Sequence, residues 1–212
     1  MDEEPKLFDI MFSTRAMRRL KPDPVPPELI EQILRAGQAA PSGGNSQNWG
    51  FLVVKDAAIK AQVQVYYQRA YDDTVGKVYA AELEAAPPGE AREKVRRRVA
   101  ATTYLNEHFH EAPVWIVACL QVGNRGGPVS GASIYLAVQN MLLAARALGL
   151  GSTLTARHTF YAKEVDAIFG LPEGVASFAI LPIGYPLGRF GPVNRGPLND
   201  VVHLDRWGQS YF

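Results

Sequence analysis

Apolar and polar positions follow helical spacing in the first part of the chain. Apolar residues that recur three and four positions apart predict one helix over residues 5–20 and a second over residues 28–40. Pro27 suits the first turn of the second helix, where no backbone donor is needed. The prolines of residues 21–27 fix φ and remove donors, so this stretch is predicted to be an extended linker.

Runs that are apolar at every position predict strands buried on both faces. Predominantly apolar runs of this kind predict strands over residues 51–54, 114–120 and 175–183, and residues 152–155 are a further, short strand candidate. Residues 130–148 give the clearest helix pattern, rich in Ala and Leu, with Gly149 as a left-handed cap. A helix this apolar on all sides must be buried, either in a core or in a subunit interface.

The remaining segments are predicted to be helices and loops. Residues 56–110 form a charged and aromatic helical region with a break at 85–89, residues 162–169 a helix, and residues 123–127 a loop. The irregular tail from residue 184 carries four aromatic residues: Phe190, Trp207, Tyr211 and Phe212. Exposed tails rarely hold so many aromatics, so the tail is predicted to pack on a partner subunit. Helices interleaved with short strands predict an α+β or α/β protein.

Composition narrows the class of protein. With 212 residues, 23.2 kDa and 47% hydrophobic residues, the chain suits one domain over residues 1–212. A net charge of +1 gives no general attraction to nucleic acid or acidic lipid. No apolar run reaches about 18 residues, and residues 1–5 hold no apolar targeting segment. We therefore expect a soluble, cytoplasmic protein with no nucleic-acid or membrane partner.

Several kinds of chemistry lack their signature. Cys119, the single cysteine, excludes an internal disulfide, and its apolar surroundings favour a core thiol over a nucleophile. His108 and His110 face different sides of a helix, so no metal site is predicted. The chain contains no P-loop, no G-x-G-x-x-G and no G-x-S-x-G.

Three segments far apart in the sequence are candidates for binding chemistry. The arginines of residues 14–19 suit an anionic ligand, or form a basic helix end. The glycines and amides of residues 40–49 suit the edge of a flat heteroaromatic ring, or form an ordinary turn. Arg195, within residues 188–198, suits a phosphate, or is a surface residue in a coil.

Taken together, these segments resemble the nitroreductase (flavin reductase-like) superfamily. The family opens with R-S-x-R-x-F, then has P-V-P, then A-P-S-x-x-N-x-Q-P-W. Here the corresponding residues are RAMRRL (15–20), PVP (24–26) and APSGGNSQNW (40–49). The long helix over 139–151 and the strand and turn over 181–186 also match, so the resemblance spans about residues 8–200.

The resemblance implies a fold, a cofactor and an activity. It implies an α+β subunit with a mostly antiparallel central sheet flanked by helices, in an intertwined homodimer with two FMN sites at the interface. FMN would be reduced by NADH or NADPH in a ping-pong cycle. A small-molecule electron acceptor, such as a nitroaromatic, a quinone or a similar flat electrophile, would then be reduced in the same pocket. The flavin would carry the hydride, so no catalytic acid or base is expected from the protein.

The resemblance also implies roles for individual residues. One group would bind FMN: Arg15, Ala16, Met17 and Arg18 along the ribityl phosphate and ring edge, Ser42, Gly43, Asn45 and Gln47 near the ring and from the partner in most members, Leu154, Thr155 and Ala156 beside the ring, and Arg195 on the phosphate. Residues 56–110 would form a lid over the substrate. Substrate contacts would come from Gly44, Tyr66, Tyr71 and Tyr104. The alternative for the tyrosines is packing beneath the lid. The arm 186–212 would pack on the partner subunit.

Departures from the family pattern leave more than one function open. Thr155-Ala156-Arg157 stands where classical bacterial nitroreductases have Glu-Gly, and the Glu/Tyr/Lys lid set of the iodotyrosine dehalogenase branch is not recognisable. Dehalogenation is therefore not the leading hypothesis. The chain could also be a flavin-cleaving enzyme, a non-catalytic flavin-binding or sequestering protein, or an interaction protein that uses the basic run 90–98.

Overall fold

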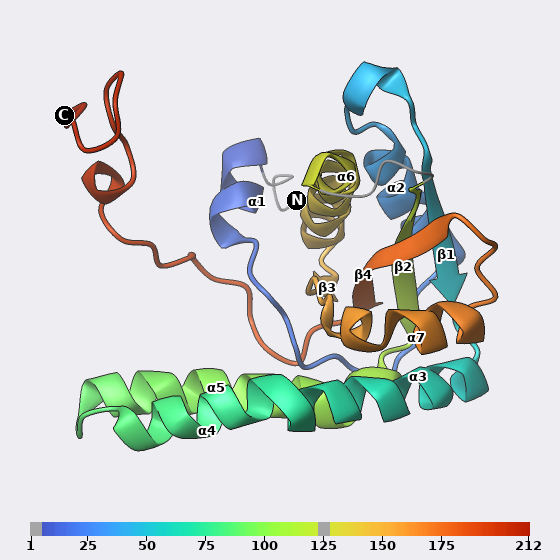
Figure 1. Ribbon diagram of the computed structural model, residues 1–212, viewed down its shortest axis with the longest axis horizontal. Coiled ribbons are helices and arrows are strands. Elements are labelled where there is room, and N and C mark those ends of the chain that lie inside the picture. Colours follow the sequence, from blue (N-terminus) through green and yellow to red (C-terminus); the bar gives the residue numbers. More distant parts are fainter. Residues whose placement is uncertain (1–5, 123–127) are drawn as a thin grey trace, which may run out of the picture.

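The centre of the protein is a four-stranded antiparallel sheet. A computed structural model describes residues 6–122 and 128–212. Within it the strand order is β1-β2-β4-β3 (Figure 1). The strands are β1 (Trp49–Val54), β2 (Val114–Gln121), β3 (Gly151–Ser152) and β4 (Val175–Gly184). The expected α+β class and antiparallel sheet flanked by helices are therefore confirmed.

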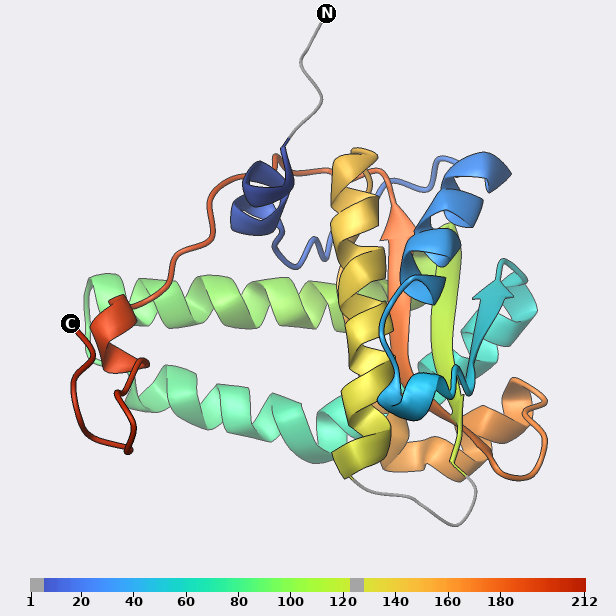
Figure 2. The same ribbon diagram turned by 90° about the horizontal axis from the view of Figure 1, so that it is seen from above.

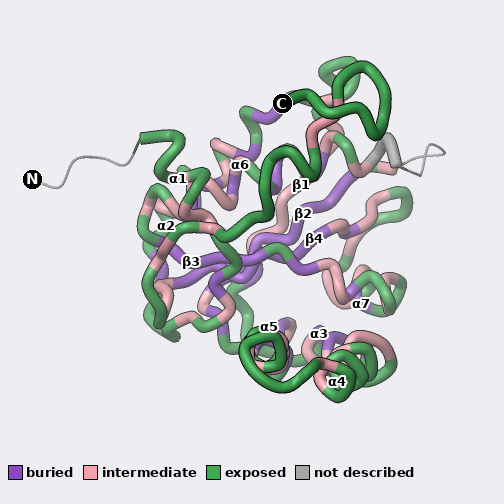
Figure 3. The backbone as a smooth tube through the Cα atoms, turned by 90° about the vertical axis from the view of Figure 1, so that its left-hand side faces the viewer, coloured by how far each residue is buried: buried purple, intermediate pink, exposed green. Residues whose placement is uncertain are grey.

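Strand β2 is apolar and buried from Val114 to Leu120 because both faces of the sheet are covered. Ile116 and Leu120 point into a core shared with α2 (Pro27–Gln38) and α6 (Pro128–Ala147). Trp115 and Val117 point into a second core on the opposite face. That face is covered by α3 (Ala57–Ala70), α5 (Glu90–His108) and α7 (Ala162–Ile168). Figures 2 and 3 show the two layers of helices and the buried strands between them.

The region predicted as a lid forms a long helical hairpin. Helix α3 continues through a π-helical turn, η2 (Tyr71–Val75), into α4 (Gly76–Ala85). Helix α5 then runs back antiparallel to α4, beyond the edge of the sheet (Figure 1). The break predicted at residues 85–89 is confirmed, with Gly89 in a left-handed conformation at φ +100°. Three single turns lie elsewhere: η1 (Gly43–Asn45), η3 (Phe109–Glu111) and η5 (Leu198–Asp200).

The helix predicted over residues 5–20 is much shorter in the structure. Helix α1 spans Leu7–Ser13, and Thr14 is already extended. The hydroxyls of Ser13 and Thr14 donate to helix carbonyls, which competes with continuation of the helix. The extended chain beyond then pairs with the sheet, because Met17 N–H donates to the Ser152 carbonyl at 2.9 Å. The arginines of residues 15–19 therefore do not form a basic helix end.

The strand predicted over residues 152–155 is interrupted. Only Gly151 and Ser152 belong to β3, and Thr155 rejoins the same ladder as an isolated bridge to Ile180. This register places Thr153 opposite Pro182, which has no N–H to donate. As a consequence of this interruption, the backbone at residues 153–154 leaves the sheet.

Helix α6 has one buried face and one exposed face in the single chain. Ile134 and Met141 are fully buried, whereas Leu136 is 47% exposed. The helix ends as predicted, with Gly149 at φ +74°. The loop predicted over 123–127 lies outside the described residues. No helix in the described part is long and apolar enough to cross a bilayer.

The C-terminal tail leaves the body of the chain (Figure 1). Phe190 packs near the body, but Trp207 is 90% exposed, and Tyr211 and Phe212 are also exposed. The structure thus shows three of the four tail aromatics uncovered in the single chain.

A buried histidine joins the chain after the interrupted strand to the sheet. His158 is fully buried in η4 (Arg157–Tyr161), and its Nε2 lies 3.0 Å from Ser177 Oγ on β4. The Ser177 hydroxyl donates to Asp166, so His158 Nε2 carries the proton and donates to Ser177. Burial lowers the pKa of His158 to about 4, because the charged ring would lose its hydration.

This pKa predicts a pH-dependent stability. Between about pH 6.5 and pH 4 the unfolded chain binds a proton at His158 that the folded chain does not. The free energy of unfolding should therefore fall as the pH falls through this range, by on the order of 3 kcal/mol for this residue. Urea unfolding of the wild type and of His158→Gln, followed at several pH values, measures the difference. Asp166 titrates in both proteins, so parallel pH profiles would contradict the assignment.

Candidate active site: an arginine-lined pocket

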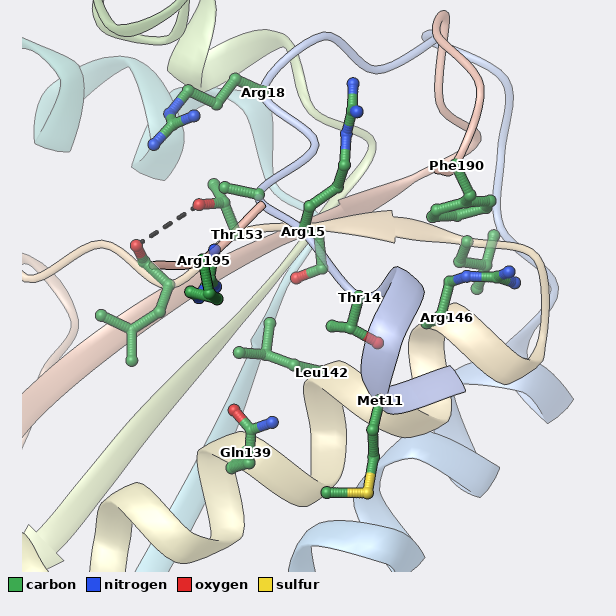
Figure 4. A pocket seen from close by; sticks show the side chains of 14 residues that line it. Met11, Thr14, Arg15, Arg18, Gln139, Leu142, Arg146, Thr153, Phe190 and Arg195 are labelled. Atoms are coloured by element: carbon green, nitrogen blue, oxygen red, sulfur yellow. Dashed lines mark hydrogen bonds between the residues drawn. The ribbon is translucent and has the colours of Figure 1, made fainter. Parts of the chain in front are cut away.

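A pocket of about 390 Å³ lies at the β3 edge of the sheet. Its walls come from α1, the extended segment after it, α6, the interrupted strand and the start of the tail (Figure 4). Its volume is in the range of small-molecule binding sites. Fourteen residues line it: Met11, Thr14, Arg15, Ala16, Arg18, Gln139, Leu142, Arg146, Leu150, Ser152, Thr153, Leu154, Phe190 and Arg195.

Close packing of the extended segment on β3 shapes this pocket. A Cβ atom at Gly151 would lie only 2.8 Å from Leu20 Cδ2 and 3.0 Å from Met17 Cβ. Only glycine therefore allows the segment to lie directly on the strand. Met17 is buried by this packing, and its neighbours Ala16 and Arg18 face the pocket. Successive side chains of an extended chain point to opposite sides, so Met17 faces the core whereas Ala16 and Arg18 face the pocket.

Four guanidinium groups reach the pocket without a carboxylate partner. Arg15, Arg18, Arg146 and Arg195 all line it. None of them takes part in an ion pair found within residues 6–122 and 128–212. Arginine keeps its charge and presents paired donors that match phosphate or carboxylate oxygens. The pocket is therefore suited to an anionic ligand.

Arg146 is held in place by two contacts. Its guanidinium carbon lies 4.1 Å from the centre of the Phe190 ring, and its Nε donates to Ser13 Oγ at 3.0 Å. Figure 4 shows Arg146 beside Phe190, on the wall formed by α6 and the tail. A guanidinium fixed by stacking and one hydrogen bond is preorganised, so less side-chain entropy is lost when it binds a ligand.

Uncharged polar atoms complete the lining. The Ser152 hydroxyl is buried and has no hydrogen-bond partner in the described part of the chain. Gln139 presents an amide from α6, and Thr153 Oγ1 contacts only the Leu154 carbonyl, at 3.5 Å. A buried polar atom without a partner costs free energy, which a ligand that binds it would recover.

The structure brings part of the predicted FMN-binding set together. Arg15, Ala16, Arg18, Leu154 and Arg195, from three distant segments, line the same pocket. The other members of these segments lie behind the wall. Met17 is buried, Thr155 is buried with its hydroxyl 2.9 Å from Tyr67 Oη, and Ala156 is only partly exposed.

The predicted loop at residues 42–47 does not reach this pocket within one chain. It packs on the opposite end of α6, where Gly43 N–H donates to Ser133 Oγ at 3.1 Å. Gly44, Asn45 and Gln47 adopt positive φ, and Gln47 Nε2 donates to Asn45 Oδ1. Ser42 Oγ accepts from Gln47 N–H at 3.0 Å, and Gln47 lines a separate depression with Trp49. Hydrogen bonds within the loop and to α6 therefore hold its conformation.

The three tyrosines proposed for the substrate lie around the base of the hairpin, outside the pocket lining. Tyr66 packs on Tyr161 with ring centres 5.7 Å apart. The Tyr71 hydroxyl lies 2.7 Å from Thr103 Oγ1. Tyr104 stacks on His108 at 4.1 Å. Tyr66 and Tyr71 thus contact other elements, and the Tyr104 ring, stacked on its own helix, is also covered by Arg19 at 4.6 Å, as the packing hypothesis expects.

Further pocket residues were not singled out from the sequence: Met11, Gln139, Leu142, Arg146, Leu150, Ser152, Thr153 and Phe190. One signal was present. Gln139 and Arg146 are polar positions seven residues apart in an apolar helix, so they share one face. Two polar side chains on one face of an otherwise apolar helix indicate that this face lines a cavity.

A nucleophilic cysteine, a metal site and a binding surface on the basic run 90–98 have little support among the described residues. Burial raises the pKa of the Cys119 thiol to about 12, so it stays protonated and unreactive. No cluster of His, Cys, Asp and Glu among the described residues could hold a metal ion. The basic run 90–98 is partly neutralised, because Arg96 and Arg97 pair with Glu93 and Arg98 pairs with Glu82.

The fold and the pocket define an α+β protein with a preformed binding site for an anionic ligand at a sheet edge. The model of the Nitroreductase family matches residues 12–185, and the chain belongs to this family of oxidoreductases. The family resemblance drawn from the sequence motifs is thereby confirmed.

The names of individual relatives differ in the activity that they give. Over 196 residues, 92% of this chain and 95% of the relative, the sequence is 29% identical to iodotyrosine deiodinase of Thermotoga neapolitana. It is 34% identical to NADH dehydrogenase of Thermus thermophilus over 199 residues, 89% of this chain and 90% of that one. A crystal structure of oxidised iodotyrosine deiodinase bound to FMN and 3-iodo-L-tyrosine is 28% identical, with a TM-score of 0.70 over 95% of this chain and 99% of that chain.

Proposed function

We propose that the protein is an FMN-dependent oxidoreductase that uses NADH or NADPH to reduce nitroaromatics, quinones or similar flat electrophiles. One observation carries the proposal. Four arginines without carboxylate partners and the unpartnered hydroxyl of Ser152 line one preformed pocket. FMN, when bound, accepts a hydride from the nicotinamide and passes reducing equivalents to the acceptor.

The donor set of the pocket fits FMN. A phosphate carries up to two negative charges and prefers arginine forks, which Arg15, Arg146 and Arg195 of the pocket lining would supply. Arg18 points toward the hairpin and brings positive charge to that side of the pocket (Figure 4). Such a charge stabilises negative charge that develops on a ligand there. Gln139, Ser152 and Thr153 supply further hydrogen-bonding groups to a ligand in the pocket.

The absence of a catalytic acid or base among the lining residues agrees with this chemistry. The fourteen lining residues include no carboxylate, histidine, cysteine or lysine. What the chain contributes is binding, orientation and charge. Leu142, Leu150 and Leu154 provide apolar surface for a flat ring and keep water away from it.

The similarity to deiodinases favours a second candidate, the reductive dehalogenation of a halogenated tyrosine. In the relative bound to FMN and 3-iodo-L-tyrosine, both ligands are present together. The same spectroscopic experiment distinguishes this candidate from the first.

The test is an absorbance spectrum of the purified protein from about 300 to about 550 nm, the range of flavin absorbance. We expect a flavin spectrum that bleaches anaerobically with NADH or NADPH and recovers when a nitroaromatic or a quinone is added. Recovery with 3-iodo-L-tyrosine alone would favour the second candidate. A spectrum that does not bleach would favour a sequestering role, and permanent loss of flavin absorbance in air would favour flavin cleavage.

Arg195→Ala should weaken FMN binding about ten- to hundredfold, because it removes a charged donor to the phosphate. Riboflavin, which lacks the phosphate, should bind both proteins equally. Arg96→Ala is the matched control, since Arg96 is exposed, pairs with Glu93 on the hairpin and does not line the pocket. Arg195→Ala that keeps stoichiometric FMN through dialysis would count against the role of Arg195.

We further propose a homodimer in which the partner's loop at residues 42–47 closes the FMN pocket. Three sets of apolar side chains support this proposal, since a single chain leaves them uncovered. Leu7, Phe8 and Phe12 of α1 are 62–65% exposed, Leu136 of α6 is 47% exposed and Trp207 of the tail is 90% exposed. Monomeric proteins rarely expose so much apolar surface.

Sedimentation equilibrium should give twice the chain mass of 23.2 kDa. Leu136→Glu should reduce the mass to that of one chain and weaken FMN binding, because it places a charge in the interface. Lys94→Glu on the exposed hairpin serves as a control for the added charge. A wild-type mass of 23.2 kDa with FMN bound would refute the shared site.

A further inference from the structure

Arg157 lies outside the set of pocket residues, at the point where the hairpin meets the pocket wall. It comes shortly after Leu154, which lines the pocket, and directly after Thr155 and Ala156. Its side chain contacts both legs of the hairpin at their base: Tyr67 on α3, Tyr71 in the π-helical turn and Asn106 on α5.

The guanidinium of Arg157 is rigidly held. Its central carbon lies 4.6 Å from the centre of the Tyr67 ring and 4.9 Å from that of Tyr71. Its Nη1 donates to Asn106 Oδ1 at 3.0 Å, and Asn106 is itself buried and bonded to Gln68. Two ring faces and one amide thus fix the orientation of the group before any ligand binds.

The contacts of Arg157 leave its charge unbalanced. None of the ion pairs found in the described ranges includes it. The nearby carboxylates are engaged elsewhere: Asp72 accepts from Gln68, and Asp73 accepts from Tyr161 and lies 3.7 Å from Arg69. Of its five N–H donors, one is used for Asn106, and the side chain is partly exposed.

The charges of Arg157 and of the pocket-lining Arg18 both act on the buried Tyr67 side chain, and the Arg157 guanidinium carbon lies 4.6 Å from its ring centre. Both charges lower the pKa of Tyr67, although burial dominates and raises it overall. Tyr67 Oη also lies 2.9 Å from Thr155 Oγ1. Arg18 points from the pocket toward the hairpin (Figure 4), and Arg157 contacts the base of that same hairpin.

We propose that Arg157 determines substrate specificity by binding an anionic group, such as a carboxylate, on a flat aromatic electron acceptor. This inference rests on the proposed oxidoreductase function and names the class of acceptor. The four arginines that line the pocket are assigned to FMN, whereas Arg157 lies outside that lining and its charge is available to the acceptor. It lies at the base of the hairpin, the region expected to cover the substrate, and shortly after the pocket-lining Leu154.

The test compares 4-nitrobenzoate with 4-nitrobenzamide, which has a similar shape and no charge. The wild type should reduce the benzoate with the higher kcat/KM. Arg157→Gln should lower kcat/KM for the benzoate about tenfold, the effect of about 1.4 kcal/mol, and change that for the benzamide less than twofold. Arg157→Lys, which keeps the charge, should retain part of the preference.

Arg69→Gln is the matched control. Arg69 also stacks on a tyrosine, Tyr161 at 4.9 Å, but it has a carboxylate partner in Asp73. This variant should leave the ratio between the two acceptors unchanged. Bleaching of the flavin by NADH or NADPH should be the same in all variants, so a failure of that step concerns the proposed function and not Arg157.

Three results would overturn the inference. The first is a wild type with no preference for the benzoate. The second is an equal loss for both acceptors in Arg157→Gln, which would indicate that Arg157 only positions the hairpin. The third is a loss confined to reduction by NADH or NADPH, which would mean that Arg157 binds the electron donor.

Discussion

The fold depends on covering both faces of the central strand pair, β2 and β4. Their side chains are apolar on both sides, so neither face can be left in water. Helices α2 and α6 cover one face, and α3, α5 and α7 cover the other. With both faces occupied, a binding site can form only at a sheet edge. The short β3 edge, next to Pro182, is where the backbone leaves the ladder and the pocket opens.

The electrostatics of this edge explain why the pocket is suited to a ligand. Like charges that converge without counter-charges repel one another and lower the stability of the folded chain. Four arginines and the unpartnered Ser152 hydroxyl therefore lower the stability of the folded single chain. An anionic ligand recovers this free energy, so binding and folding are linked. Arg157 extends the same positive field to the base of the hairpin.

Much of the site could be predicted from sequence because its motifs are local. Arg15, Arg18, Leu154 and Arg195 lie in short segments with distinctive residue types, and the structure brings them to one pocket. Residues such as Met11, Leu142 and Phe190 could not be predicted, because nothing local distinguishes an apolar side chain that lines a pocket from one that fills a core. The extent of α1 was predicted wrongly, because competition from the Ser13 and Thr14 hydroxyls outweighed the apolar spacing.

The sequence by itself determined the fold class, the strands, most helix limits and the family, because periodicity, glycine and proline act over a few residues. The tertiary structure decided which side chains meet. The extended course of residues 14–20 follows from pairing with β3, and the interrupted strand from its register against Pro182. The place of Arg157 between two tyrosines depends on how the hairpin packs against the sheet. These are contacts between residues far apart in the chain, and only the packing of the whole fold fixes them.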